Sequence, residues 1–225
     1  MLLFAAALPA LCQDLVAVAP QAAKVEYEDA RVRVVRLRIA PKASLPMHDR
    51  PARVVIPLVS SDVHATRADG TTSMARSVAG KPVWSEPGRR SITNLVDPVD
   101  NIVVELKRAD APGKPLAQPP SPRPAGYLED WFHHWLFENQ YVRVYDVRIP
   151  PGQITDFHVH ALDTVFVQIS RGLTTDQTQG QPWAKAERDK PGSVDFSPDA
   201  KQPRTHRVRN DGTDEYHVIA VQFLQ

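Results

Sequence analysis

The chain has 225 residues, enough for one large domain or two small ones of about 100 residues each. Its 27 basic and 26 acidic residues nearly cancel, which excludes the one-signed charge typical of proteins that bind nucleic acid or anionic membranes. Apolar residues make up 42% of the chain, enough for a core, and 21 prolines favour short strands over long helices.

Residues 1–12 (MLLFAAALPALC) are almost wholly apolar and too short to span a bilayer. We interpret them as the apolar part of a secretory signal and assign residues 1–19 to a signal segment and lead-in. This predicts a periplasmic or secreted protein; acylation of Cys12 as a lipoprotein and a buried first strand, in a cytoplasmic protein, are the alternatives. Removal of the segment would leave no cysteine, and so no disulfide or thiolate ligand.

An internal repeat follows. Residues 28–41 match residues 138–151 at a constant offset of 110, and seven of the fourteen positions are identical. The same offset aligns His48 with His158. Near the end of each copy the offset becomes 116, where Asn94 aligns with Asn210 and residues 102–104 align with residues 218–220. Both copies alternate apolar and polar residues and are rich in valine, which predicts β-strands.

The two copies are separated by residues 109–126, a proline-rich segment with six prolines in eighteen positions. Such a segment is a stiff, extended spacer that either bridges two domains or lies along a barrel surface. Residues 127–135 are expected to form one short helix. We therefore predict an all-β protein with one unit at residues 20–108, a linker at residues 109–126 and a second unit at residues 127–225.

The second copy contains a His-x-His pair, His158 and His160, in a strand that follows a Pro-Gly turn. Side chains two positions apart on a strand project from the same face, so both imidazoles point the same way. Two imidazoles on one face are half of a divalent metal site. His206 is the leading candidate for the third ligand.

These spacings resemble the two motifs of the cupin superfamily. The first motif is matched by Gly152, His158, His160 and Gly172, and the second by Gly192, Pro198, His206 and Asn210. There are two departures from the motifs. The glutamate position of the first holds Thr164, or Val165 with the longer spacing, and the second has three extra residues before His206 and Ala200 in place of a glycine.

The resemblance implies two tandem jelly-roll barrels, a bicupin, with the metal site in the C-terminal barrel only. It also implies that His206 approaches His158 and His160 to hold a divalent ion. Fe(II) is favoured, although imidazole suits Zn, Ni and Cu as well and Mn is an alternative. Residues that could line the pocket or orient the ligands are Thr164, Asp163, Asn210, Tyr216 and His217.

Three of these positions carry specific expectations. Asp163 points away from the metal on a regular strand, and only a bulge would bring it in. Either Tyr216 or His217 faces the barrel interior, because neighbours on a strand alternate. His133 and His134, just before the second barrel, are assigned to packing or surface roles.

The first copy has lost most of these ligands. The alignment places His48, Arg50, Val54 and Arg90 where the second copy has His158, His160, Thr164 and His206. Arginine stays protonated and does not ligate metals, so we expect a metal-free first barrel. It serves either as a scaffold or as an anion pocket built from His48, Arg50 and Arg90.

Three functions fit the sequence, and it identifies no catalytic residue. The first, implied by the resemblance, is a three-histidine metal-dependent dioxygenase that acts on a small molecule. The second is an exported, non-catalytic protein that binds a small ligand, and the third is a metal-dependent sugar or acid isomerase or epimerase. All three predict a small-molecule partner with no nucleic acid and no membrane span, and a homodimer is left open.

Overall fold

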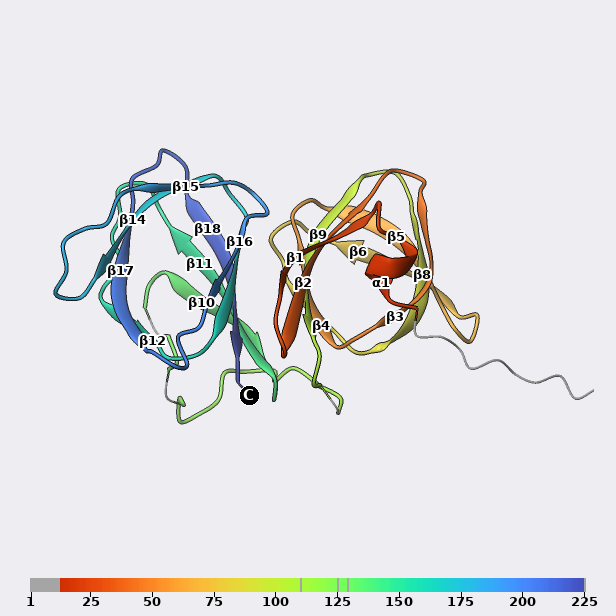
Figure 1. Ribbon diagram of the computed structural model, residues 1–225, viewed down its shortest axis with the longest axis horizontal. Helices are drawn as coiled ribbons and strands as arrows, with labels where there is room; N and C mark the ends of the chain where they lie inside the picture. Colours follow the sequence, from red (N-terminus) through yellow and green to blue (C-terminus); the bar gives the residue numbers. More distant parts are fainter. Residues whose placement is uncertain (1–12, 110, 125, 129, 225) are drawn as a thin grey trace, which may run out of the picture.

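The computed structural model describes residues 13–109, 111–124, 126–128 and 130–224, which form two β-barrels side by side (Figure 1). The signal segment predicted at residues 1–12 lies outside the described residues. Within the described part of the chain, no helix has the length and apolar character needed to cross a membrane.

The N-terminal barrel has one short helix and nine strands among its described residues. They are α1 (Leu15–Val18), β1 (Ala23–Glu28), β2 (Val32–Ile39), β3 (Ser44–Arg50), β4 (Arg53–Pro57), β5 (Ser61–Arg67), β6 (Thr72–Ser77), β7 (Val83–Ser85), β8 (Gly88–Asn94) and β9 (Val99–Leu106). They form a five-stranded sheet, ordered β1-β2-β9-β4-β7, and a four-stranded sheet, ordered β3-β8-β5-β6. Leu15 and Ala19 of the predicted lead-in pack inside this barrel.

The C-terminal barrel repeats this arrangement with nine strands of its own in the described range. They are β10 (His133–Glu138), β11 (Val142–Ile149), β12 (His158–His160), β13 (Thr164–Gln168), β14 (Gly172–Thr178), β15 (Glu187–Asp189), β16 (Val194–Ser197), β17 (Arg204–Asn210) and β18 (Tyr216–Phe223). The sheets are ordered β10-β11-β18-β13-β16 and β12-β17-β14-β15, the same orders as in the first barrel. The predicted all-β fold of two tandem barrels is confirmed.

Strand register corrects the predicted alignment of the last strands. Arg36 on β2 faces Ile102 on β9, and its counterpart Asp146 on β11 faces Ile219 on β18. Ile102 therefore corresponds to Ile219, an offset of one residue more than the 116 predicted. The extra residue lies in the loop before the last strand. A shift of one residue matters because it reverses which side chains face the barrel interior.

The same comparison changes the counterpart of Thr164. Thr164 on β13 faces Gln222, whereas in the first barrel Arg53 on β4 faces Glu105. Because Glu105 and Gln222 are corresponding residues of β9 and β18, Thr164 corresponds to Arg53. The prediction of Val54 at this position is wrong, because the connection before β13 is one residue longer than the connection before β4.

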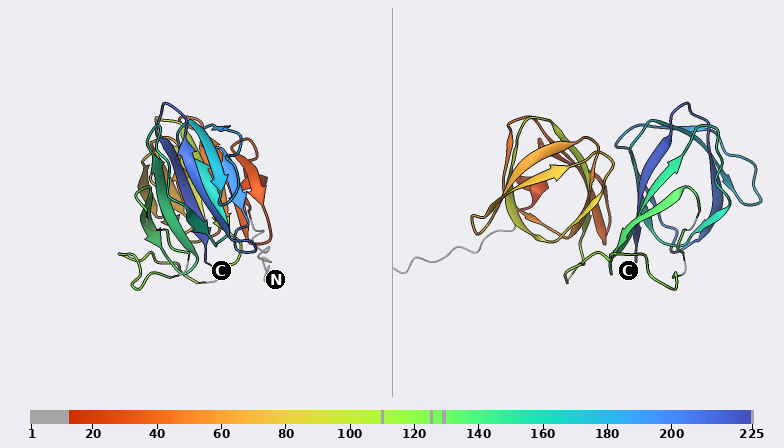
Figure 2. Two further views of the ribbon diagram at one scale, coloured as in Figure 1. Left: turned by 90° about the vertical axis from the view of Figure 1, so that its left-hand side faces the viewer. Right: turned by 180° about the vertical axis from the view of Figure 1, so that it is seen from behind.

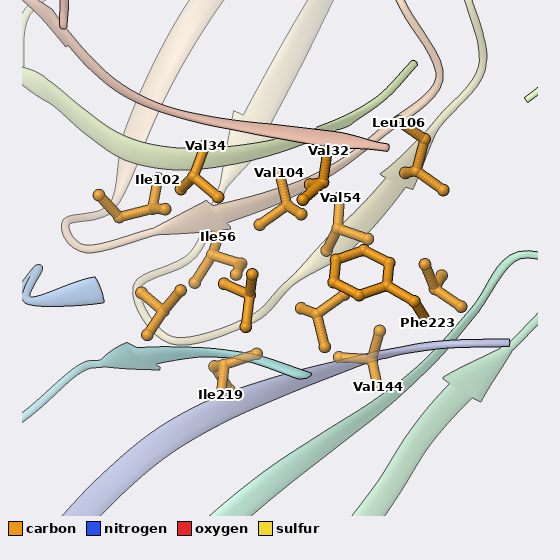
Figure 3. Packing of buried hydrophobic residues seen from close by; sticks show 14 of the residues in the cluster. Val32, Val34, Val54, Ile56, Ile102, Val104, Leu106, Val144, Ile219 and Phe223 are labelled. Carbon is orange, nitrogen blue, oxygen red and sulfur yellow. The ribbon is translucent and has the colours of Figure 1, made fainter. Parts of the chain in front are cut away.

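The largest apolar cluster lies between the two barrels (Figure 3). Alternate residues of the five-stranded sheets point outward from each barrel and meet the other barrel. The buried residues of this cluster include Val34, Val54, Ile102 and Val104 from the first barrel and Val144, Val165, Ile219 and Phe223 from the second. The other face of each sheet lines a barrel interior, where the smaller clusters lie. The two barrels therefore share their largest apolar cluster, and each has a smaller one in its interior.

The described residues between β9 and β10 form no helix or strand and pass below both barrels (Figures 1 and 2). Gly113 donates its N–H to Glu86 of the first barrel, and its carbonyl accepts a hydrogen bond from Asn139 of the second. Ala111 bonds the hydroxyl of Tyr141. The proline-rich segment thus lies against both barrels.

The helix predicted at residues 127–135 is absent from the described part of that range. Residues from His133 onward instead form β10, which pairs antiparallel with β11. A cross-strand partner in the existing sheet outweighs the local aromatic pattern that suggested a helix.

Candidate metal centre

Four histidines meet inside the C-terminal barrel. The register of β12 with β17 places His158 directly opposite His206, and His160 projects from the same face as His158. The ring centroids of His206 lie 4.7 Å from His158 and 4.9 Å from His160. His133 on β10 approaches from the adjoining sheet, with its centroid 4.8 Å from that of His158. Ligand nitrogens of His133, His158 and His160 all lie within 4.8 Å of one another.

The rings of three of these histidines are anchored through Nδ1. His133 donates to the carboxylate of Asp130 at 2.8 Å, and His158 donates to the carbonyl of Asp156 at 2.9 Å. His206 donates to the carboxylate of Asp176 at 2.5 Å. A hydrogen bond at Nδ1 fixes the tautomer and leaves Nε2 as the ligand atom.

Burial sets the protonation state of the cluster. Burial, followed by the neighbouring imidazoles, lowers the pKa of His158 to about 4 and that of His160 to about 2. Both rings are therefore neutral near physiological pH, which is the form that binds metal. Burial opposes ionisation of Asp130, but the hydrogen bond from and the charge interaction with His133, together with the backbone N–H groups of Phe132 and His133, outweigh it and lower the pKa of the carboxyl to about 2.

Two polar atoms of the cluster have no hydrogen-bond partner among the described residues. They are Nε2 of His206 and Nδ1 of His160, and both are buried. A buried polar atom without a partner costs free energy, which a bound ion would recover for Nε2 of His206. Imidazoles that converge in this way fit a divalent transition metal.

The cluster lies in the wall of a cavity of about 630 Å³. One part of this cavity is apolar, with Val147, Ile149, Phe166 and Val218, and the Phe166 ring lies edge-on to His160 with its centroid at 5.6 Å. The rest of the wall is polar. It has four carboxylates, Asp176, Glu187, Asp189 and Asp195, together with Gln168, Lys185, Arg204 and Tyr216. Burial raises the pKa of the Tyr216 phenol, so this hydroxyl keeps its proton.

Comparison with protein-family models and with curated sequences finds no match. Among solved structures, the chain is similar to AerE from Microcystis aeruginosa, with a TM-score of 0.62 and 12% identity over 91% of this chain and 98% of that one. It is also similar to an oxalate decarboxylase from Lactobacillus farciminis, crystallised as a formate complex, with a TM-score of 0.58 and 15% identity over 90% and 80%. The chain has the bicupin fold.

A third similar structure is that of the oxalate decarboxylase of Bacillus subtilis, described in connection with its Mn(II) centres. Its TM-score is 0.55 at 14% identity, over 85% of this chain and 68% of that one. At such low identity the likeness establishes the fold and not the activity.

The position that holds a glutamate in the cupin motif is not filled by a carboxylate in this chain. Thr164 is buried and donates its hydroxyl to the carbonyl of Leu162. Asp163 faces away from the histidines, where it pairs with Arg31 of the first barrel and accepts the N–H of Ala200. No bulge brings it inward. His133 lies in the cluster instead.

The sequence predicts a packing or surface role for His133, whereas the structure places it in the histidine cluster. The inward position of His133 follows from the pairing of β10 with β11, in which His133 stands opposite Val147. Val147 faces the barrel interior, and directly paired residues share a face of a sheet. The neighbouring His134 is exposed on the opposite face.

Of Tyr216, His217 and Asn210, the remaining residues predicted to line the pocket, the structure places only Tyr216 in the cavity wall. Tyr216 lines the cavity, whereas His217 points to the other side of β18, with Nε2 2.7 Å from the carboxylate of Asp146. Asn210 is buried and donates to the carbonyls of Ile149 and Asp214, so it holds together the turns at the end of the barrel. Tyr216 is therefore the one that can contact a ligand.

The first barrel keeps the same register with different residues. His48 stands opposite Arg90, as His158 stands opposite His206, and Arg50 takes the place of His160. His48 is buried and its Nδ1 bonds the carbonyl of Pro46, much as His158 bonds Asp156. His160 and His206 have arginine counterparts here and His133 corresponds to Ala23, so this group cannot form a comparable metal centre.

Proposed function

We propose that the C-terminal barrel is the site of a metal-dependent enzyme that acts on a small polar molecule, with dioxygenase-type oxidation as its reaction class. The observation that carries the proposal is the convergence of four imidazoles in the wall of a cavity large enough for a small substrate. Fe(II) is the first candidate for the ion, with Mn, Zn, Ni and Cu as alternatives.

The ligand set supports this reaction class. A divalent ion held by imidazoles alone keeps its full charge and acts as a Lewis acid or, as iron, as a redox centre. The protein supplies the positioning of that ion. Asp130 orients His133 and Asp176 orients His206, so two of the rings are fixed by carboxylates on separate segments.

Two cavity residues are suited to hold the substrate. The Tyr216 phenol is neutral and can donate a hydrogen bond to a substrate oxygen. The side-chain Nε2 of Gln168 is buried and has no hydrogen-bond partner within the described chain. Both lie in the cavity wall, so a substrate with hydroxyl, carbonyl or carboxyl oxygens would satisfy them.

A second candidate function is a metal-dependent isomerase or epimerase. It is favoured by Asp189, whose pKa is raised by burial and by the nearby carboxylates of Glu187 and Asp195. A carboxyl with a raised pKa in a cavity wall is suited to general acid–base catalysis. Proton transfer at a substrate carbon would then replace oxidation.

Metal analysis of the purified protein tests the site first. The wild type is expected to bind about one divalent ion per chain, and His158→Ala is expected to lose most of it because one ligand disappears. Full metal retention in His158→Ala contradicts the proposal. His134→Ala is the matched control, since its exposed imidazole faces away from the cluster.

Two assays then separate the reaction classes. Iron-loaded protein is incubated with small acids, polyols and phenols while oxygen consumption is recorded, and the same panel is repeated in D₂O. Oxygen uptake that His158→Ala lacks supports the dioxygenase-type oxidation. Deuterium incorporation without oxygen uptake supports the isomerase. Saturable ligand binding with neither signal shows the third function, a non-catalytic ligand-binding protein.

A further inference from the structure

The interior of the first barrel holds more positive than negative charge. Val35, Val55 and Val103 pack in the interior cluster of this barrel. Arg33, Arg53 and Glu105 lie two positions from these valines on the same strands, so they share the inward face.

Four arginines meet two carboxylates among the described residues of this interior. Arg33 pairs with Asp14 and Glu105, and Arg53 also pairs with Glu105 at 3.1 Å. Arg50 and Arg90 form no ion pair with a carboxylate of the described residues, and the charges of Arg53 and Arg90 act on Arg50 more strongly than that of Glu105. Two positive charges are therefore in excess.

The excess charge stands where the second barrel has its metal ligands. Arg50 corresponds to His160 and Arg90 corresponds to His206. Arg53 corresponds to Thr164, the position that holds a glutamate in the cupin motif. At these three positions the second barrel has metal-binding or neutral side chains, whereas the first barrel has guanidinium groups, which bind oxyanions.

Several guanidinium N–H groups in this interior have no hydrogen-bond acceptor among the described residues. Arg50 Nε and Nη1 and Arg53 Nη2 are buried and have no partner in the part of the chain that the structure describes. The Arg53 side chain is only 1% exposed. A buried guanidinium N–H without an acceptor is costly, and a charged acceptor recovers more than a neutral one.

We propose that the first barrel binds one small oxyanion, such as a dicarboxylate or inorganic phosphate, between Arg50, Arg53 and Arg90. The anion would accept the three unused donors and offset the two excess charges. Burial and the charges of Arg53 and Arg90 outweigh the opposing charge of Glu105 and lower the pKa of Arg50 to about 8, in keeping with an excess of positive charge around it. The proposal does not depend on the metal centre of the second barrel.

The test is calorimetric titration of the full-length protein, stripped of metal by a chelator, with malonate and separately with inorganic phosphate at constant ionic strength. Chloride at the same ionic strength is the blank. A saturable heat with a stoichiometry of about one anion per chain is expected from at least one of the two, together with a concentration-dependent rise in melting temperature. The stronger ligand distinguishes carboxylate from phosphate as the natural class.

Variants then locate the site. Arg50→Gln is expected to weaken binding at least tenfold, because it removes the charge and the unused donors. Arg89→Gln is the control, since Arg89 neighbours Arg90 on β8 but pairs with Asp49 at 2.8 Å. A wild type without saturable heat or a melting-temperature rise for either anion overturns the proposal. Equal affinity in Arg50→Gln and Arg89→Gln overturns it too, and if Arg50→Gln does not fold, Arg90→Gln takes its place.

Discussion

Asp176 on β14 and His206 on β17 are joined by a hydrogen bond of 2.5 Å between a carboxylate oxygen and Nδ1 of the imidazole. The strands are paired, and Asp176 stands opposite Val208, two residues along from His206. The bond turns Nε2 of His206 toward the other histidines. It makes Asp176 a positioning residue for the proposed metal centre.

Asp176→Asn is expected to lower metal affinity by about 10–100-fold, because an amide holds the imidazole less firmly and makes it a weaker base. Competition with a chelator of known affinity measures the change. Asp189→Asn is the control. Asp189 lies in the same cavity wall, but its position in the sheet is opposite Gly172 on β14, away from His206. Equal losses in the two variants would contradict the positioning role.

His133 provides a second test of the cluster. Replacing it with alanine removes one imidazole and leaves the Asp130 carboxylate without its partner. We expect a loss of metal affinity at least as large as that for Asp176→Asn, and a changed absorption spectrum of the cobalt-substituted protein because the coordination changes. If His133→Ala and His134→Ala give the same affinity and spectrum, His133 is not a ligand.

The parts of this site that sequence could predict are those set by local spacing. His158 and His160 share a face because they are two residues apart, and the repeat places both on a strand. The cupin motif adds His206, and the register of β12 with β17 brings it opposite His158. These steps require only periodicity and a recognised motif.

The remaining features depend on distant pairing. His133 joins the cluster through the pairing of β10 with β11, and the aromatic residues around it had suggested a helix. Arg53 is recognised as the counterpart of Thr164 only when the one-residue difference in length between the two connecting loops is taken into account. Asp163 is turned away by Arg31, 132 residues earlier in the chain. None of these partners is visible in a window of local sequence.

The shared core between the barrels predicts their joint unfolding. Ile56 is fully buried in the cluster between the five-stranded sheets. Ile56→Ala is expected to cost about 2–5 kcal/mol in the free energy of unfolding, because it leaves a cavity in that cluster. Both barrels should still unfold in one transition during urea denaturation. Val96→Ala is the control, since Val96 is 75% exposed and its loss should change stability by less than about 0.5 kcal/mol.

His48 makes stability depend on pH. Burial lowers its pKa in the folded protein below the usual 6.5. As the pH falls through 6.5 the unfolded chain takes up a proton that the folded barrel does not, so stability decreases toward acid pH. Urea unfolding at about pH 7.5 and about pH 5.5 should show a smaller loss for His48→Gln than for the wild type. Equal losses would refute this, and His134→Gln should behave as the wild type.

The last prediction concerns Gly192, which lies at the contact between the barrels with a φ of +81°. A Cβ there would lie 2.6 Å from Nη1 of Arg36 and 2.8 Å from a methyl of Leu58. The Arg36 side chain cannot easily withdraw, because it forms two hydrogen bonds of 2.9 and 2.8 Å with Asp100. Gly192→Ala therefore combines a strained backbone with overpacking of the interface.

Gly152→Ala isolates the first of these costs. Gly152 has a similar φ of +74°, and a Cβ there meets no atom within 4 Å. We expect Gly152→Ala to cost about 1–2 kcal/mol of stability from the positive φ alone. Gly192→Ala should cost about 1–3 kcal/mol more. Denaturant unfolding of both variants measures the difference, and equal stabilities would mean that Arg36 does not press on Gly192 in solution.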